Sequence, residues 1–518
     1  MSGALLILLG VLLLGGILSG APVSFVLIGV PTLIAFLGAT FGHFDLGFLA
    51  AFPSRAFGIM TNDVFLSVPL FVLMGGLLEK SDIAKRMMLT AGALFGDREG
   101  GMAYAVVIVG ALLAASTGVI GASIFMLGLI AMPAMLQAGY SKSLASGVIC
   151  ASGSLGQIIP PSILLILLTD QISSAYQAGR RSAGEWAVEP VSVGDLFAGA
   201  FIPGLLLVAL YILYVFFMSK RRPDTCPPVV MRDEAGNRTR PDLKEVTYSL
   251  VLPLLLIVIV LGSILGGIAT ATESAALGAA GALVMTAMDR PGVPRWRLAV
   301  MLAVLPAAIA LVLVKFAGGA QAGPLAAAFG TVALVFLCVG TLTALAQELR
   351  HGGVWAVSVD TASMVAMLTL IVLGATMLSL VFRGLHGEAM VEDFLHGLPG
   401  GNMTAVLVVM AIIFLLGFVI EYVEIIFIVV PIAGPPLMAA GVDPVWFAIL
   451  ISMNLQISFL TPPFGYALFY FRRVAPASVQ TIDIYRGILP FILLQIVALA
   501  IVVLVPGLAT WLPDAIYH

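Results

Sequence analysis

Charged residues are scarce in this sequence. They make up 10% of its 518 residues, whereas soluble domains carry about 25% charged residues. Hydrophobic residues make up 61% of the chain, and the mean hydropathy is +1.14. These values exclude a soluble globular protein. The formal net charge of −3 indicates no particular partner because the few charges fall mostly in expected loops, and we expect no nucleic-acid ligand.

The motifs of several protein classes are also missing. The three cysteines, Cys150, Cys226 and Cys338, have no CxxC spacing, so neither a disulfide framework nor a metal knuckle is predicted. None of the five histidines pairs with another inside an apolar run, which argues against a haem-carrying respiratory subunit. No G-x-x-x-x-G-K-[ST] sequence occurs, so we expect no P-loop ATP site. The N-terminus lacks a cationic n-region, so we expect the first helix to be kept.

Apolar runs of about 20 residues or more recur along almost the whole chain, and each can cross roughly 30 Å of hydrocarbon as a helix. The 55 glycines suit membrane helices that pack closely or break, and the short alternating strands of a transmembrane barrel are absent from the sequence. The predicted fold class is therefore an all-α polytopic membrane protein. Basic residues cluster in the hydrophilic loop 219–247, which the positive-inside rule places in the cytoplasm.

Two Pro-Pro pairs interrupt two of the most apolar stretches at matching places. Moving the sequence along itself by 302 positions brings Pro160-Pro161 onto Pro462-Pro463, and Gly139 onto Gly441, without a gap. A broken apolar helix repeated in two halves of a membrane protein is typical of a transporter's binding site.

Each half is predicted to contain a re-entrant helical hairpin followed by a helix broken in mid-membrane. Such backbone is tolerable at that depth only when it is buried in protein or lines a cavity. The predicted elements are a hairpin at 100–137 with its tip at Ser116-Thr117-Gly118, a broken helix at about 142–169, a hairpin at 404–440 with its tip near Glu421–Glu424, and a broken helix at 443–474.

The breaks are candidate cation sites. Proline lacks an N–H, and its ring clashes with the carbonyl four residues earlier. The first Pro-Pro pair is therefore expected to free the carbonyls of Gly156 and Gln157, and the second pair those of Ser458 and Phe459. Na⁺, a hard cation, takes oxygen ligands. Four hydroxyl side chains lie within a turn or two of these carbonyls and could add ligands: Ser152, Ser154, Ser458 and Thr461. The alternative is that each Pro-Pro pair only kinks its helix and binds no ion.

The two hairpin tips differ chemically. Ser116-Thr117-Gly118 offers hydroxyls and a glycine that permits a tight turn, although small residues also serve helix contacts in membranes. Glu421 and Glu424 share a helix face, and ionisable residues inside a span are functional by default. Placement of these carboxylates at the membrane interface is the alternative. Two non-equivalent cation sites are therefore expected.

Two further charged residues lie in or beside apolar runs. Glu273 begins a helix for which Thr270 or Thr272 is a candidate N-cap. Because carboxylates favour helix N-termini, a structural role for Glu273 is at least as plausible as ion binding. Lys315 lies near the end of an apolar run, and we expect its side chain to reach the interface.

Several short pieces of the sequence form a specific combination: Ser67–Phe71, Ile158–Ser162, Thr270–Ser274, Gly441–Pro444 and Thr461–Gly465. On these pieces the chain resembles, over most of its length, the large membrane subunit of tripartite ATP-independent periplasmic (TRAP) transporters. It departs from the family pattern at Val119, Glu421 and Ser458, where the family favours serine, aspartate and glycine. Residues 290–352 look like an insertion of two membrane helices relative to shorter members of the family.

The resemblance implies a Na⁺-driven elevator transporter built on an inverted structural repeat, with a multi-pass location in the bacterial inner membrane. Its implied partners are a small membrane subunit, a separate periplasmic solute-binding protein, an organic-acid substrate and the lipid bilayer. We expect no organic cofactor. The expected segments are scaffold helices at 1–99, transport-domain half 1 at 100–172, scaffold helices at 173–289, the inserted pair at 290–352, a scaffold helix and loop at 353–403, transport-domain half 2 at 404–474 and a C-terminal helix at 475–518.

These considerations yield two sets of predicted site residues. The substrate-binding set is Ser116, Thr117, Gly118, Ser152, Glu421, Glu424 and Asn454. The Na⁺ set is Gly118, Gly156, Gln157, Pro160, Ser458, Phe459, Thr461 and Pro462.

Two other classes of function are the alternatives. An ion channel, or a proton-translocating subunit of a redox complex, would use Glu421, Glu424 and Lys315 as relay groups. A relay needs ionisable groups across the whole membrane, whereas the carboxylates here cluster at one tip. A membrane enzyme would need a metal triad or a nucleophile–base pair, and the sequence suggests neither, so we expect no catalytic residues.

Overall fold

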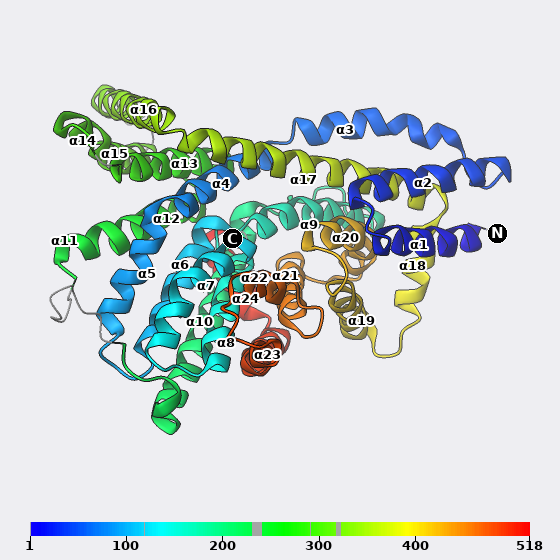
Figure 1. Ribbon diagram of the computed structural model, residues 1–518. Helices are drawn as coiled ribbons and strands as arrows, with labels where there is room; N and C mark the ends of the chain where they lie inside the picture. Colours follow the sequence, from blue (N-terminus) through cyan, green and yellow to red (C-terminus); the bar gives the residue numbers. More distant parts are fainter. Residues whose placement is uncertain (1, 119, 230–240, 291, 317–322, 518) are drawn as a thin grey trace. The chain divides into compact units, whose positions relative to one another are not determined.

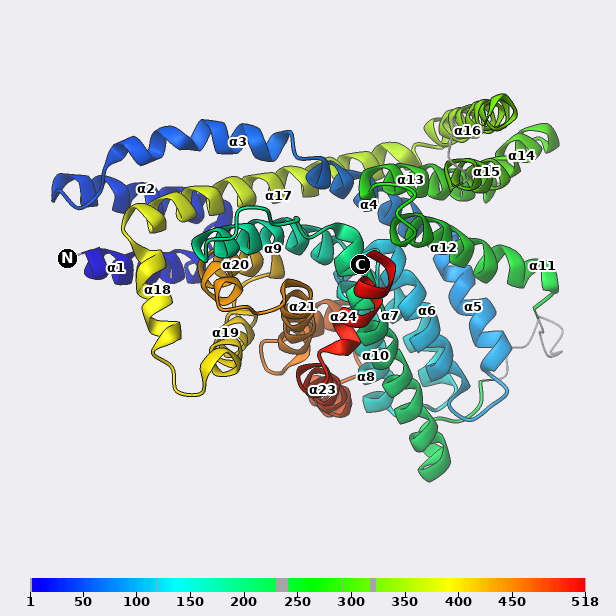
Figure 2. The ribbon, with the colours of Figure 1, turned by 180° about the vertical axis from the view of Figure 1, so that it is seen from behind.

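The computed structural model describes residues 2–118, 120–229, 241–290, 292–316 and 323–517, and within these ranges the chain forms helices joined by turns, without strands (Figures 1 and 2). The predicted all-α class is confirmed. The chain divides into two compact units. Unit 1 comprises Met1–Leu66, Leu164–Leu196 and Ala362–Ser458, and unit 2 comprises Ser67–Ile163, Phe197–Thr361 and Phe459–His518.

Unit 1 holds the N-terminal helices, the second hairpin and most of α17. Within it, α1 packs on α2, and α19 packs on both α18 and α20. Its elements are α1 (Ser2–Leu18), α2 (Val23–Thr40), η1 (Leu46–Ala51), α3 (Phe52–Met60), nearly all of α9 (Ile163–Ser182), the greater part of α17 (Gly353–Gly384), α18 (Gly387–His396), α19 (Gly401–Leu416), α20 (Tyr422–Ala439) and most of α21 (Pro444–Leu460).

Unit 2 is built around the first hairpin. Helices α6, α7 and α8 pack on one another, and α23 packs against α8. Its elements are most of α4 (Asp63–Lys80), α5 (Asp82–Phe95), α6 (Gly101–Thr117), α7 (Ile120–Gln137), α8 (Lys142–Ser154), η2 (Leu155–Gln157), most of α10 (Val193–Arg221), η3 (Pro223–Thr225), α11 (Leu243–Val246), η4 (Thr247–Val251), α12 (Leu252–Leu265), α13 (Ala271–Met288), α14 (Arg295–Leu302), α15 (Val304–Phe316), α16 (Pro324–His351), α22 (Tyr466–Val474), α23 (Thr481–Leu504) and α24 (Gly507–Tyr517).

Ten helical segments of the described chain are long and apolar enough to cross a membrane, which confirms a multi-pass membrane protein. The first arms of both predicted hairpins, α6 and α19, are not among the ten and count as shorter apolar helices. At 17 residues, α6 rises about 25 Å, less than the roughly 30 Å of a bilayer core. A re-entrant hairpin arm needs no greater length.

The predicted repeat is visible in the helix bounds. Adding the 302-residue offset to α7 gives the bounds of α20, Tyr422–Ala439, and adding it to the first residue of α8 gives Pro444, where α21 begins. Both Pro-Pro peptide bonds are cis. The grouping of these elements into a transport domain and a scaffold stays a prediction.

Two segments differ from the sequence-based expectation. The first broken helix does not end near residue 169, because α9 continues to Ser182. Ile172, Ala175 and Gly179 are buried at helical spacing in this extension, so an apolar stripe holds it in place although its other face is polar. Helix α3 lies where no helix was predicted.

The inserted helices of unit 2 are held to α13 by ion pairs. Lys315 does not act alone at an interface, since its Nζ lies 2.8 Å from Oε2 of Glu273. That carboxylate also accepts a hydrogen bond from the Thr270 amide, which completes the predicted N-cap as a capping box. Arg290 donates two hydrogen bonds of 2.7 and 2.9 Å to Glu348 of α16, and these bonds raise the pKa of Arg290.

Candidate functional site

The tip of the first hairpin lies against the start of α9. Gly118 ends α6 with a φ of +61°, a left-handed conformation that glycine adopts without a steric penalty. A β-carbon at this position would lie 3.1 Å from the Ile163 side chain and 3.2 Å from its amide nitrogen. The side chains of Ser116 and Thr117, and the whole of Val119, lie outside the described part of the chain.

The first break lies on the same hairpin. A β-carbon on Gly156 would lie 3.4 Å from Ala114 of α6, so η2 approaches the last turn before the tip. The carbonyl of Gln157 accepts a 2.9 Å hydrogen bond from the Ser162 hydroxyl. A side-chain hydroxyl from beyond the Pro-Pro pair thus bonds to one of the two carbonyls predicted at the first break.

Ser152 holds the helix before the break against α6. It is fully buried, and its Cβ would lie 2.6 Å from a β-carbon placed on Gly110. Its hydroxyl has no hydrogen-bond partner within the described residues, and such a buried polar group needs an explanation such as a water or an ion. This observation supports Ser152 as a site residue.

The second hairpin shows the same arrangement inside unit 1. The side chain of Ser458 packs on Gly417, which follows α19, and its Cβ would lie 2.9 Å from a β-carbon placed on that glycine. Nδ2 of Asn454 donates a 2.7 Å hydrogen bond to the Met410 carbonyl of α19. Asn454 and Ser458 are the 302-residue counterparts of Ser152 and Gly156, so both halves hold the broken helix against the first hairpin arm.

The acidic tip belongs to the same unit. Glu421 is the N-cap residue of α20, and Glu424 lies in its first turn, where the helix dipole favours negative charge. Glu424 is 5% exposed, and its Oε2 has no hydrogen-bond partner among the described residues. Placement at the membrane interface, the alternative to a functional role, therefore does not fit Glu424, because its side chain is buried in the protein.

The second break places backbone oxygens close together in unit 2. A β-carbon on Gly465 would lie 2.9 Å from the Phe459 carbonyl oxygen and 3.0 Å from that of Thr461. Two carbonyl oxygens therefore lie near one glycine just after the Pro462-Pro463 pair. Oxygens arranged in this way suit a hard monovalent or divalent cation better than a transition metal.

The predicted residues thus fall into two groups. Within unit 1 the structure brings Glu421 and Glu424 onto one helical turn and packs Asn454 and Ser458 on the hairpin that bears them. The rest of the described set lies in unit 2. This unit-2 group comprises Gly118, Ser152, Gly156, Gln157, Pro160, Phe459, Thr461 and Pro462. The part of the chain that the structure describes holds no group of three or more His, Cys, Asp or Glu side chains able to bind a metal.

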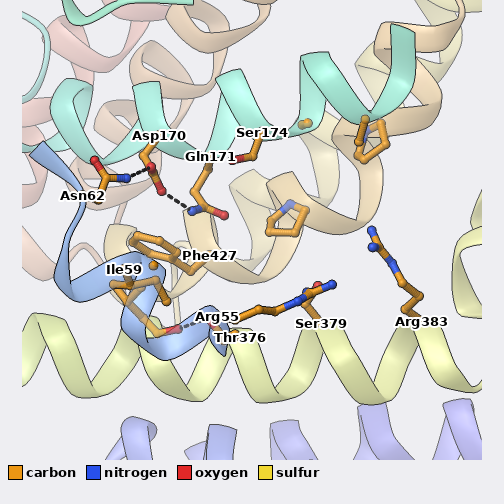
Figure 3. A pocket seen from close by; sticks show the side chains of 17 residues that line it. Arg55, Ile59, Asn62, Asp170, Gln171, Ser174, Thr376, Ser379, Arg383 and Phe427 are labelled. Atoms are coloured by element: carbon orange, nitrogen blue, oxygen red, sulfur yellow. Dashed lines mark hydrogen bonds between the residues drawn. The ribbon is translucent and has the colours of Figure 1, made fainter. Parts of the chain in front are cut away.

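A polar cavity in unit 1 was not predicted from the sequence. Its volume is about 330 Å³, and Figure 3 shows Asp170 and Gln171 of α9 facing Arg55 and Arg383 across it. Taken alone in the sequence, each of these residues resembles a polar residue at the membrane interface. The arginines before and within apolar segments are the only sequence signal that could have revealed the cavity.

Comparison with known proteins identifies the family. The model of the tripartite ATP-independent periplasmic transporter, DctM component, matches residues 7–314 and 293–508. The C4-dicarboxylate TRAP transporter large permease protein DctM of Vibrio cholerae is 28% identical over 98% of this chain and 97% of its own. The 2,3-diketo-L-gulonate TRAP transporter large permease protein YiaN of Escherichia coli is 23% identical over 98% of both chains.

A solved structure shares the fold. The YdaH transporter of Alcanivorax borkumensis superposes with a TM-score of 0.54 over 91% of this chain and 90% of its own, at 15% sequence identity. The helical repeat, the membrane spans and the family match agree. The chain is a transport protein of the tripartite ATP-independent periplasmic transporter family and belongs to its DctM component, the large permease.

Proposed function

We propose that this chain imports an organic acid across the bacterial inner membrane, driven by a Na⁺ gradient. The import would require a small membrane subunit and a periplasmic binding protein that delivers the solute. Relatives are named for C4-dicarboxylates, sialic acid and 2,3-diketo-L-gulonate, which carry carboxylate groups, and one is named for isethionate, which carries a sulfonate instead. Family membership and the acidic group common to these solutes support the substrate class.

The observation that carries the Na⁺ proposal is the second break. The Phe459 and Thr461 carbonyl oxygens lie near each other, 2.9 and 3.0 Å from a β-carbon placed on Gly465, and carbonyl oxygens replace the hydration shell of an alkali cation without adding charge. The unpartnered hydroxyl of Ser152 at the first break supports a second, chemically different site.

The elevator mechanism is supported by the repeated hairpin-and-break unit. In each half the hairpin and the segment before the break pack on one another through small residues, as at Gly110 and Gly417. Packing of this kind lets each half move as a rigid body past other helices, whereas a fixed pore would need no such repeated unit.

Cation binding can be tested on the chain alone. A ligand that binds only the native protein raises its unfolding temperature in proportion to the logarithm of ligand concentration above the Kd. We expect NaCl to raise the unfolding temperature of the purified chain more than KCl or choline chloride at equal ionic strength. Equal effects of the three salts would refute Na⁺ as the coupling ion.

A further inference from the structure

The cavity of unit 1 is lined by charged and polar side chains together with apolar ones. At about 330 Å³ it lies at the small end of the range for ligand pockets, roughly 300–1,000 Å³. Four separate stretches of the chain contribute to it: α3 with the turn after it, α9, α17 and α20. All of its lining residues belong to unit 1.

The two sides of the cavity carry opposite charge. Asp170, Gln171 and Ser174 reach into it from α9 (Figure 3). Arg55 reaches in from α3 and Arg383 from α17 on the other side. Phe427, Pro431 and Pro435 of α20 add an apolar wall. A solute held here would therefore meet cationic groups at one end and a carboxylate at the other.

Arg55 lacks a counter-charge of its own. Within the described residues no carboxylate lies within ion-pair distance of its guanidinium group, although Arg383 and Glu388 act on it electrostatically. A half-buried arginine in a membrane protein is costly unless it is paired. A carboxylate that enters the cavity can accept two parallel hydrogen bonds from this planar group.

Arg383 is available for a similar contact. It pairs with Glu388 at 2.7 Å, but their side chains are 42% and 40% exposed. Ion pairs as exposed as this contribute little to stability, so a solute carboxylate can displace Glu388 at little cost.

Asp170 faces the arginines with spare acceptor capacity. Its two oxygens accept hydrogen bonds of 2.7 Å from Asn62 and 2.8 Å from Gln171. An ionised carboxylate offers about four lone-pair positions, so two remain after these bonds. The amides fix the orientation of the carboxylate and leave it ready for a donor in the cavity.

We propose that this cavity holds the transported solute, with the solute carboxylate on Arg55 and Arg383 and a hydroxyl or ammonium group on Asp170. The substrate class is thus a small organic acid that carries a hydrogen-bond donor. This inference rests on the proposed function insofar as it takes an organic acid to be the cargo.

Thiol labelling tests the charge of the cavity without any ion gradient. Ser379→Cys places a thiol on the arginine side, in a chain freed of Cys150, Cys226 and Cys338 and held in lipid nanodiscs. Ser379 lies on the side that carries the two arginines, and a cleft wall of one charge sign raises the local concentration of counter-ions by about 10-fold or more. Relative to their rates with a free thiol, an anionic methanethiosulfonate should therefore react about 10 times faster than a cationic one.

Substitutions assign this preference to residues. Arg55→Gln should remove most of the preference for the anionic reagent, and Arg55→Lys should retain it because the charge is kept. Arg181→Gln is the matched control, since Arg181 lies on α9 outside the cavity and bonds to Gln177. It should leave the ratio unchanged. The unfolding temperature of each variant should equal that of the Ser379→Cys parent, which shows that a change in labelling rate does not come from misfolding.

Protection by acids tests the donor group. Succinate, malate and aspartate differ only in a hydrogen, hydroxyl or ammonium group, and propionate, lactate and alanine repeat the comparison with one carboxylate. The hydroxylated or aminated acids should protect the thiol at about 10-fold lower concentration than the plain acid, and Asp170→Ala should abolish the difference. Equal reactivity of both reagents, or no protection by any of these acids, would overturn the site.

These outcomes are separable from the proposed Na⁺ coupling. Labelling and protection need no Na⁺ gradient, so a failure of coupling leaves them intact. Na⁺-driven uptake combined with an unprotected thiol would instead refute only the cavity as the solute site.

Discussion

Asn454 donates its side-chain amide to the Met410 carbonyl at 2.7 Å, and this bond joins the helix before the second break to the first arm of its hairpin. Ser152, its counterpart 302 residues earlier, makes the equivalent junction by packing closely on Gly110. The two halves thus share one architecture and differ in the chemistry of the junction.

Asn454→Ala should impair transport more than its loss of stability explains. The lost hydrogen bond contributes about 1 kcal/mol to the free energy of unfolding. Without it, α21 is held less firmly against α19, and the backbone at the Pro462-Pro463 break should move. Asn402→Ala is the control, because its amide donates to the Ala440 carbonyl at 2.6 Å near the open end of the same hairpin. Thermal unfolding should show a smaller loss for Asn402→Ala, whose bond is exposed, and solute uptake should show a large defect only for Asn454→Ala. Equal uptake by both variants would contradict a role for this junction.

Gly417→Ala should destabilise unit 1 by about 1–3 kcal/mol, because the added methyl group overlaps the Ser458 side chain. Gly29→Ala offers a helical control, since a β-carbon there meets nothing within 4 Å; it should be neutral or slightly stabilising. Urea or thermal unfolding in detergent measures both. A Gly417→Ala protein as stable as the Gly29→Ala protein would show that the tip and the break are not tightly packed.

Gly465→Ala should weaken Na⁺ binding. The new methyl group would lie 2.9 Å from the Phe459 carbonyl oxygen and 3.0 Å from that of Thr461, so these oxygens must move apart. Disturbance of the groups that orient metal ligands typically costs about 10–100-fold in affinity. The Na⁺ concentration that gives half of the maximal thermal stabilisation reports this change. Gly507→Ala, with open space around it, should bind Na⁺ normally; an unchanged Na⁺ response in Gly465→Ala would remove the second break from the cation site.

Arg290→Ala should lower the free energy of unfolding by about 3 kcal/mol, since it leaves Glu348, whose side chain is 1% exposed, without its partner. The double variant Arg290→Met with Glu348→Met should recover most of that loss because no buried charge remains. Arg180→Ala leaves Glu185, whose side chain is 51% exposed, without its partner and should lower the free energy of unfolding by about 1 kcal/mol or less. Unfolding midpoints of the four proteins test the order. If the double variant proved less stable than Arg290→Ala, the pair would be a net stabiliser instead.

The repeat could be predicted because its signals are local. Proline breaks and a positive-φ glycine act through the backbone of their own segment, so Pro160, Pro462 and Gly118 fix where helices stop. Helices α7 and α20 likewise end two residues before Gly139 and Gly441, whose φ angles are +88° and +86°, so their ends follow the 302-residue offset. Glu273 and its N-cap Thr270 were predictable in the same way.

The cavity could not be predicted because its parts are distant in sequence. Arg55, Asp170 and Arg383 lie on three helices and meet only through tertiary packing. A single charged residue near the end of an apolar run reads as interfacial, which is also why the Lys315–Glu273 pair was not predicted. The extension of α9 was missed because its polar face concealed a buried stripe.

Uptake into proteoliposomes tests the central claim most directly. The chain is reconstituted with its small subunit and loaded binding protein, and accumulation of labelled solute is followed under an inward Na⁺ gradient, an inward H⁺ gradient or neither. The account predicts accumulation only with the Na⁺ gradient, its collapse by a Na⁺ ionophore, and loss of uptake in Thr461→Ala and Glu421→Gln. Equal accumulation without a Na⁺ gradient would contradict it.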